Sequence, residues 1–444
     1  MLLQELKKNF YSHLFRKNHR ERNSIMKKKF CLLLVPLIFF VSIVFAQSYD
    51  IVIKGGHVID PKNNLDAVLD VAIKDGKIVK LDDNIDAKLA TQAVNAKDMY
   101  VTPGLIDLHA HVFFGTEPDH YLSNGMTAVV PDGFTFRVGV TTVADAGGAG
   151  WKSFPTFKKN IIDNSQTRVL SFLNIVGEGM RGGAYEQDVS DMDAKLSSQV
   201  AKQYKDYVVG FKVAHFSGAE WTPVDRAVEA GKLADMPVMV DFGVSTPPLS
   251  IEELYMKHLR PGDIYTHTYT LLEGNVRETV VDTVTNKVKP FIWDAIKKGI
   301  VFDVGYGGAS FNFTQAIPAI KQGFFPKTIS TDLHTGSMNT SMKSQIDVMS
   351  KFLVMGMPLN EVIKASTWAP AQVIKREELG HLSVGAIADV AVLNLREGNF
   401  GFYDKTGYKV NGKQKFECEM TIKGGKIVYD LNGIANPIYV KSKK

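Results

Sequence analysis

Between residues 103 and 376, short apolar segments alternate with segments of helical pattern, and this alternation limits the fold more than any other feature. Near-continuous apolar strands are typical of a parallel sheet that is covered on both faces. Eight strand–helix units over this length match the roughly 250 residues of a (β/α)8 barrel. The helical pattern is clearest in residues 192–204, 224–234 and 345–355. The predicted strands are residues 104–112, 139–147, 168–177, 207–216, 236–243, 263–270, 299–307 and 327–334.

The competing arrangement of alternating strands and helices is an open, doubly wound parallel sheet. Nucleotide-binding sheets of that kind carry a glycine-rich phosphate loop after the first strand, and none follows residues 104–112. The sequence therefore predicts an α/β chain built on a TIM-type barrel.

Both flanks of the barrel have a different pattern, with alternating polar and apolar residues and Gly-Gly or Asp-Gly turns. This pattern covers residues 49–60, 67–81, 387–395 and 417–433. We therefore predict a barrel at 103–376 and a β-rich domain that combines 47–102 with 377–444.

The first 46 residues have the pattern of an export signal. Three lysines at 27–29 precede an apolar run from Phe30 to Phe45, and the small residue Ala46 ends the run. Met26 stands directly before the lysines, so we expect translation to start there and cleavage to follow Ala46. The mature protein is then periplasmic or secreted, with no membrane span after cleavage. An uncleaved anchor is the alternative.

The net charge of the whole chain is +5, but the first 46 residues contain nine Lys or Arg and two Asp or Glu. The remainder is near −2, so a basic surface for nucleic acid or for a membrane is not expected. Of the two cysteines, Cys31 lies in the leader and Cys418 near the C-terminus, which leaves the mature chain without an internal disulfide. A homo-oligomer is compatible with the sequence, which leaves the oligomeric state open.

Several polar residues stand where a barrel mouth is predicted. His109 and His111 are two residues apart on the first strand, so both imidazoles point to the same face. That face is the mouth, where barrel enzymes carry out their chemistry. Unpaired charge in a buried strand is costly, so either metal ions or salt bridges at strand ends must compensate the charged candidates. The further candidates are Lys212, Asp241, His267 and Asp332.

Five motifs span nearly the whole mature chain: PGLIDLHAHV at 103–112, GFKV at 210–213, RPGDIYTHTY at 260–269, STDLH at 330–334 and GHLSVGAIADVAVL at 380–393. In this order they resemble the amidohydrolase superfamily, and within it the dihydroorotase-like group of deacetylase metallohydrolases. The resemblance implies a barrel inserted in a small β-sandwich that both chain ends form. It also implies one to two divalent ions at the barrel mouth, expected to be zinc, with manganese or iron as alternatives.

The resemblance also implies a role for each candidate ligand. His109, His111 and Asp332 would bind one ion and His267 the other, while Lys212, carboxylated by CO2, would bridge them. At strand five the relatives have a histidine, whereas PVMVDFG places Asp241 here. A carboxylate oxygen can ligate zinc at a similar distance, so we expect Asp241 to be a ligand; the alternative is an enzyme with one ion.

Three residues are candidates for contact with the substrate. Tyr306 stands where relatives often carry histidine, Arg181 lies on the glycine-rich loop after strand three, and His334 follows Asp332. For Arg181 and His334, an ordinary loop position is the alternative. His215, three residues past Lys212, is expected to pack or to face solvent, because it falls on the opposite face of a regular strand.

The ligand types suggest a mechanism. A divalent ion lowers the pKa of bound water from 15.7 to about 7, and Asp332 can take the proton and return it to the leaving nitrogen. A nucleophilic Ser or Cys is disfavoured, because no GxSxG motif is present. The expected function is metal-dependent hydrolysis of a small amide, such as an N-acetyl amino acid. A cyclic-amide hydrolase of the dihydroorotase or hydantoinase type is the alternative, followed by a non-catalytic binding barrel.

Overall fold

The computed structural model describes residues 48–114, 127–241 and 244–438. The segment Ala46–Lys444 forms one compact unit. The predicted leader and signal peptide lie outside the described residues. Among the helices that the structure describes, none has the length and apolar character needed to cross a membrane.

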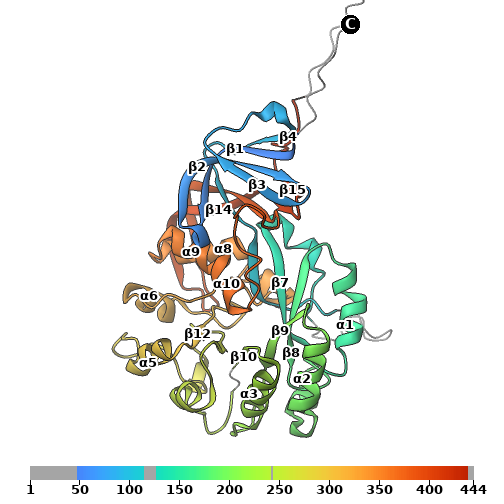
Figure 1. Ribbon diagram of the computed structural model, residues 1–444. Helices are drawn as coiled ribbons and strands as arrows, with labels where there is room; N and C mark the ends of the chain where they lie inside the picture. Colours follow the sequence, from blue (N-terminus) through green and yellow to red (C-terminus); the bar gives the residue numbers. More distant parts are fainter. Residues whose placement is uncertain (1–47, 115–126, 242–243, 439–444) are drawn as a thin grey trace, which may run out of the picture. The chain divides into compact units, whose positions relative to one another are not determined.

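The predicted barrel is present, and within the described ranges seven parallel strands follow one another in chain order, each bonded to the next (Figure 1). The residues of β6, β7 and β9 are all buried, which explains why these segments read as continuous apolar strands. The strands are β6 Leu105–Ala110, β7 Val140–Gly150, β8 Arg168–Asn174, β9 Val208–Val213, β10 Val238–Val240, β11 Ile264–Tyr265 and β12 Val301–Phe302.

The eighth predicted strand closes the barrel as an extended segment that lacks regular strand geometry. On one side, the Leu333 amide donates to the His109 carbonyl over 3.1 Å, and the His111 amide donates to the Leu333 carbonyl over 2.8 Å. On the other side, the Val304 amide donates to the Thr328 carbonyl over 3.1 Å. This segment therefore joins the β12 edge to β6, and it carries Asp332 into the mouth.

Helices connect the barrel strands, and the three predicted helices are confirmed as α2, α3 and α8. The Asp193 side chain accepts hydrogen bonds from the first amides of α2, and the Ser344 hydroxyl does the same for α8. The helices are α1 Phe154–Asn160, α2 Ala194–Gln203, α3 Thr222–Ala234, α4 Ile251–Glu253, α5 Pro290–Lys298, α6 Phe313–Lys321, α7 Thr335–Met338, α8 Gln345–Val354, α9 Leu359–Ser366 and α10 Trp368–Val373.

Strands from both ends of the chain form one branched sheet, which in the described residues has eight strands. β1 pairs with β4 along its first half and with β5 along its second half, and β5 pairs in turn with β13. Ile53, Val101, Val392 and Met420 bring both chain ends into one apolar core. The strands are β1 Tyr49–Asp60, β2 Leu65–Lys74, β3 Lys77–Asp82, β4 Ala90–Asn95, β5 Tyr100–Pro103, β13 Val390–Tyr403, β14 Lys409–Lys423 and β15 Lys426–Asp430.

The long β13–β14 hairpin extends from this sheet to the barrel. The Tyr403 carbonyl accepts from the Tyr306 hydroxyl over 3.2 Å, and Asp404 Oδ2 accepts from the Phe313 amide over 2.8 Å. The Ser350 hydroxyl of α8 accepts from the Phe416 amide of β14 over 3.0 Å. The predicted domain boundaries, at residues 102–103 and 376–377, stay predictions.

Candidate metal centre

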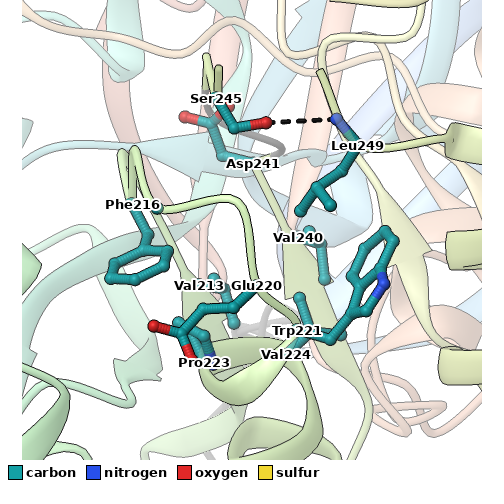
Figure 2. Close-up of a pocket in the computed structure, with 11 residues that line it drawn as sticks. Val213, Phe216, Glu220, Trp221, Pro223, Val224, Val240, Asp241, Ser245 and Leu249 are labelled. Atoms are coloured by element: carbon teal, nitrogen blue, oxygen red, sulfur yellow. Dashed lines mark hydrogen bonds between the residues drawn. The ribbon is translucent and has the colours of Figure 1, made fainter. Parts of the chain in front are cut away.

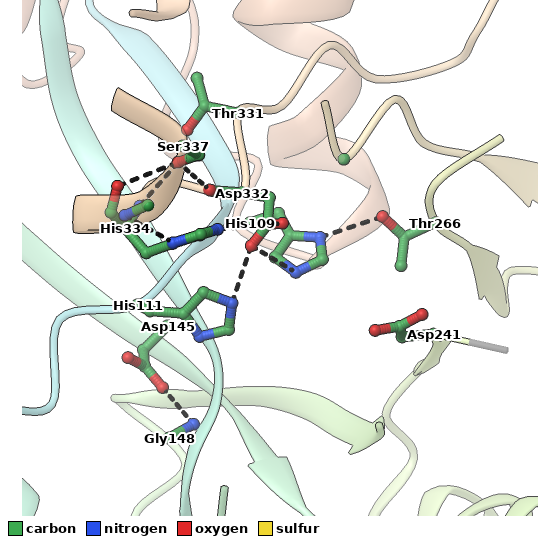
Figure 3. Close-up of polar contacts among 12 residues, drawn as sticks. His109, His111, Asp145, Gly148, Asp241, Thr266, Thr331, Asp332, His334 and Ser337 are labelled. Carbon is green, nitrogen blue, oxygen red and sulfur yellow. Dashed lines mark hydrogen bonds and ion pairs between the residues drawn. The ribbon is translucent and has the colours of Figure 1, made fainter. Parts of the chain in front are cut away.

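The carboxyl ends of the barrel strands gather the predicted ligands in one place. Asp332 lies between His111 and His109 (Figure 3), with its Oδ1 2.9 Å from His111 Nε2 and 3.6 Å from His109 Nε2. Among the described residues, His109, His267 and Asp332 are buried and have ligand atoms within 4.8 Å of one another. His111 contacts Asp332 at the side of this group, and the division of the ligands between two ions stays a prediction.

Hydrogen bonds fix which nitrogen of each histidine is free to bind an ion. His109 Nδ1 lies 3.0 Å from the Thr266 hydroxyl, which donates its own proton to Asp303 Oδ2 over 2.7 Å. The Thr266 oxygen must therefore accept the proton of His109 Nδ1. His267 Nδ1 donates to the Gly305 carbonyl. In both rings Nε2 carries the lone pair and faces the cluster, as metal binding requires.

The electrostatics of Asp332 also suit a cation. Burial opposes ionisation of this carboxyl, but His109 and His111 outweigh burial and hold its pKa well below the usual range. Burial, followed by the charge of Lys212, lowers the pKa of His109, which favours the neutral ring. A buried carboxylate beside imidazole lone pairs is a donor set that fits a divalent ion.

Lys212 is completely buried in β9, with its Nζ 3.2 Å from His109 Nε2 and 3.7 Å from the Met239 sulfur. Within the described ranges, no carboxylate lies within 4.0 Å of this amine, and burial lowers its pKa. Gly147 leaves room for the side chain, since a Cβ there would lie 2.7 Å from Lys212 Cγ. The structure therefore places an amine among the candidate ligands without a direct counter-ion.

Asp241 lies at the end of β10, where its carboxylate lies near two histidines and one arginine. Oδ2 lies 3.4 Å from His267 Nε2 and 3.5 Å from His215 Nε2, and Oδ1 lies 3.6 Å from an Arg277 nitrogen. Burial opposes ionisation, but His267 and Lys212 hold the pKa of Asp241 well below its usual range. The six predicted ligands thus lie in one connected set of contacts.

His215 departs from the expectation of a regular strand. β9 ends at Val213, and the φ of His215 is 55°, so its half-exposed ring faces Asp241 and not the opposite face. His267 and Asp332 also have positive φ, at 57° and 53°. Such backbone costs roughly 1–3 kcal/mol per residue and concentrates at functional sites.

The predicted substrate residues have different surroundings. His334 begins α7, and its Nε2 lies 3.7 Å from Asp332 Oδ2, at the edge of the cluster. Arg181 pairs with Glu178 over 3.2 Å, with its guanidinium 4.7 Å from the centre of the Tyr185 ring. Their roles toward a substrate stay predictions.

Tyr306 is almost fully buried, and its ring stacks on Phe311 with 4.3 Å between ring centres. Burial raises the pKa of its hydroxyl above the ordinary value. These contacts show how Tyr306 packs, and its role toward a substrate stays a prediction.

Lys351 lies beside Tyr306 as a buried charge, with its Nζ 4.3 Å from the ring centre and 2.8 Å from Asp347 Oδ2. Burial lowers the pKa of Lys351 from 10.5 to about 8. The unfolded chain therefore binds more protons between these two pH values, so Lys351 makes the free energy of unfolding rise with pH across that window. We expect Lys351→Met to remove this rise. Urea unfolding at about pH 8 and about pH 10 measures it.

A matched control is Lys297→Met, because the Lys297 side chain is 79% exposed. This variant should keep the wild-type difference in unfolding free energy between the two pH values. An equally unchanged difference in Lys351→Met would show that the buried amine does not gain a proton on unfolding.

Three buried carboxylates that support the cluster were not among the predicted residues. Asp145 Oδ2 accepts from the Val112 amide over 2.8 Å and Asp145 Oδ1 accepts from the Gly148 amide over 2.6 Å, which fixes the backbone just after His111. Asp107 accepts from the amides of His109 and Thr331. The third carboxylate, Asp303, accepts from the Thr266 hydroxyl that contacts His109. Burial raises the pKa of each carboxyl, that of Asp107 to about 7. Their signal in the sequence is an aspartate inside a predicted buried strand.

A pocket opens beside Asp241, between the ends of β9 and β10 and the start of α3 (Figure 2). The Ser245 hydroxyl accepts from the Leu249 amide over 3.1 Å and so holds one wall. Most of the lining is apolar, and the carboxylates of Glu220 and Asp241 are its charged groups. The apolar side chains include Val213, Phe216, Trp221, Val224, Val240 and Leu249.

Comparison with known proteins gives consistent matches. The amidohydrolase family matches residues 100–428. A deacetylase of Agrobacterium fabrum is 32% identical over 345 residues, which are 76% of this chain and 81% of that protein. A deacetylase of Enterococcus faecalis is 31% identical over 339 residues, which are 74% of this chain and 87% of that protein.

Two solved structures have folds similar to that of this chain. The crystal structure of an adenine deaminase has a TM-score of 0.75 and 28% identity, covering 86% of this chain and 100% of that one. The crystal structure of a dihydroorotase has a TM-score of 0.73 and 29% identity, covering 86% of this chain and 99% of that one. These matches confirm the predicted fold class and support a hydrolase. The chain belongs to the amidohydrolase family.

Proposed function

We propose that this chain is an exported, metal-dependent amidohydrolase that removes an N-acyl group, such as acetyl, from a small amino acid derivative. The observation that carries the proposal is the buried group of His109, His267 and Asp332, whose ligand atoms lie within 4.8 Å of one another. The fixed Nδ1 protons leave both imidazole Nε2 atoms free to bind an ion. The two deacetylases described above, 31–32% identical to this chain, support the acyl-transfer class.

The proposal assigns the metal ligands to residues of the chain. His109, His111 and Asp332 would hold the first ion, His267 and Asp241 would hold the second, and Lys212 would contribute as a carbamate. A bound divalent ion would lower the pKa of water and polarise the scissile carbonyl.

The chain's own groups then move the proton. Asp332 is a carboxylate at the centre of the cluster, so it takes the proton of the attacking water and returns it to the leaving nitrogen. His111, 2.9 Å from Asp332 Oδ1, holds that carboxylate in place. His334, 3.7 Å from Asp332 Oδ2, stands where it can meet the substrate.

The pocket beside Asp241 is small, about 20 Å³, so it supports only a small apolar group, such as a methyl, on the substrate. Its walls are aliphatic and aromatic, and Glu220 would repel a second carboxylate there. A cyclic-amide hydrolase is the second candidate, because a dihydroorotase structure superposes with a TM-score of 0.73. Both reactions use the same groups and differ in the shape of the amide.

We expect the purified protein to hold one to two equivalents of divalent metal and to hydrolyse N-acetyl amino acids only when metal is bound. The reason is that the clustered lone pairs and carboxylates are a ligand set that is incomplete without an ion. Elemental analysis measures the metal. A panel of N-acetyl amino acids with apolar and acidic side chains, together with dihydroorotate and hydantoins, measures the substrate class.

Preference for the cyclic amides would replace the deacetylase assignment by the second candidate. A protein that holds no metal, and gains no activity from zinc, manganese or cobalt, would contradict both assignments.

A further inference from the structure

His215 stands at the same level of the barrel as Asp241, on the neighbouring strand. β9 and β10 are parallel partners with Val213 opposite Val240, so the chain beyond Val213 runs alongside Asp241. The positive φ of His215 then turns its ring toward that carboxylate. His215 and His267 therefore both approach the Asp241 carboxylate from neighbouring strand ends.

The two nitrogen-to-oxygen distances at Asp241 are too long for ordinary hydrogen bonds. N–H···O bonds span about 2.7–3.2 Å, whereas Asp241 Oδ2 lies 3.4 Å from His267 Nε2 and 3.5 Å from His215 Nε2. Ligand atoms bound to one zinc at about 2.0–2.1 Å in a tetrahedral arrangement are about 3.4 Å apart. Each of these two pairs therefore has the spacing of two ligands of one ion.

The opposite side of the His215 ring is held by a carboxylate. Nδ1 lies 2.7 Å from Glu186 Oε2, and Glu186 Oε1 accepts from the Gly182 amide over 2.9 Å. The Glu186 side chain is only 3% exposed, so this acceptor is fixed. A carboxylate that accepts the second ring proton is the usual outer partner of a histidine that binds metal.

Arg277 lies near the other oxygen of the Asp241 carboxylate. Its guanidinium is buried and lies 3.6 Å from Oδ1, while Oδ2 faces the two histidines. Arg277 thus offsets the charge of one oxygen and leaves the other for an ion.

We infer that His215 is a protein ligand of a second divalent ion, together with Asp241 and His267, and that Glu186 positions it. This inference rests on the proposed function. The ligand group within 4.8 Å in the described chain does not include His215, so ion binding draws its ring toward His267. Because the His215 side chain is 54% exposed, this movement disturbs no core packing.

The test is metal stoichiometry and affinity, measured by titrating the metal-free protein with Zn²⁺ or Co²⁺. We expect the wild type to bind two ions and His215→Ala to bind one, with the dissociation constant of the second ion raised about 100-fold or more. Glu186→Gln should weaken the second ion by about 10-fold, because its amide oxygen can still accept from Nδ1. The visible bands of the second Co²⁺ should change in both variants.

The control is His258→Ala, because His258 pairs with Asp225 and not with Asp241. This variant should bind both ions as the wild type does.

The outcomes separate the two proposals. Two ions bound equally well by wild type and His215→Ala would overturn the role of His215 and leave the proposed function standing. A wild type that saturates at one ion would also overturn the role of His215 and leave the proposed function standing. His215 and Arg277 would then be ionic partners of Asp241. A protein that binds no ion would overturn both.

Discussion

Lys212→Ala is expected to remove bound metal and hydrolytic activity together. The amine of Lys212 is completely buried and lies 3.2 Å from His109 Nε2, at the centre of the candidate ligands. An ammonium has no lone pair, so it cannot bind a metal ion and would be repelled by one. A carbamate supplies two anionic oxygens at the same place.

Formation of the carbamate needs only CO2 and the neutral amine. The nitrogen attacks the carbon of CO2, a nitrogen–carbon bond forms, and one proton is released. Bound ions favour the anionic product, so carboxylation and metal loading should rise together.

Elemental analysis and the rate of N-acetyl amino acid hydrolysis measure the effect of Lys212→Ala. A short carboxylic acid should restore part of both, because it fits the vacated space and supplies the missing oxygens. Lys202→Ala, at an exposed lysine on α2, is the control and should change neither quantity. Electron density that shows an unmodified Lys212 turned away from an occupied site would contradict the carbamate, and Asp241 would become the main ligand of the second ion.

Asp332→Asn is expected to lower kcat by roughly 10²- to 10⁴-fold, the effect of losing a general acid or base. Asparagine has nearly the same shape and keeps one oxygen toward His111, but it cannot take a proton. Metal binding should therefore survive in part, and KM should change much less than kcat. Steady-state kinetics on the metal-loaded variant separate these effects.

Asp225→Asn is the matched control, since this carboxylate is 57% exposed and pairs with His258. It should leave kcat unchanged. If Asp332→Asn were as active as the wild type at equal metal content, another group would have to carry the proton.

The barrel could be predicted because its strands bury both faces, so their sequence is apolar at nearly every position. The lengths of the later strands could not be predicted from the sequence. β11 covers only Ile264–Tyr265, because the chain turns at His267 to aim its side chain into the mouth. A positive φ at a histidine leaves no mark in the sequence, since it is the surrounding structure that maintains it.

The position of the His215 ring also differs from the expectation because the sequence does not show the local backbone geometry. The expectation that it lies on the far face from Lys212 assumes that the strand continues, but β9 ends at Val213. In contrast, the approach of His109, His267 and Asp332 was predictable, since the carboxyl ends of all barrel strands meet at one mouth. Asp145 and Asp303 gave the same sequence signal as Asp241, which is a charged residue in a buried strand. They hold the ligands in place through hydrogen bonds to the Val112 amide and the Thr266 hydroxyl.

The sheet that both chain ends share has a consequence for how the protein reaches its folded state. β5 pairs with β13 through Val101 and Val392, which are 291 residues apart in the chain. Contacts between such distant residues form late and slow the folding rate. Until β13 has been synthesised, β5 presents an unpaired edge to solvent, the kind of surface that recruits other chains. The nascent polypeptide is therefore exposed to aggregation throughout the production of the barrel, and the terminal sheet can be completed only once almost the whole chain is available.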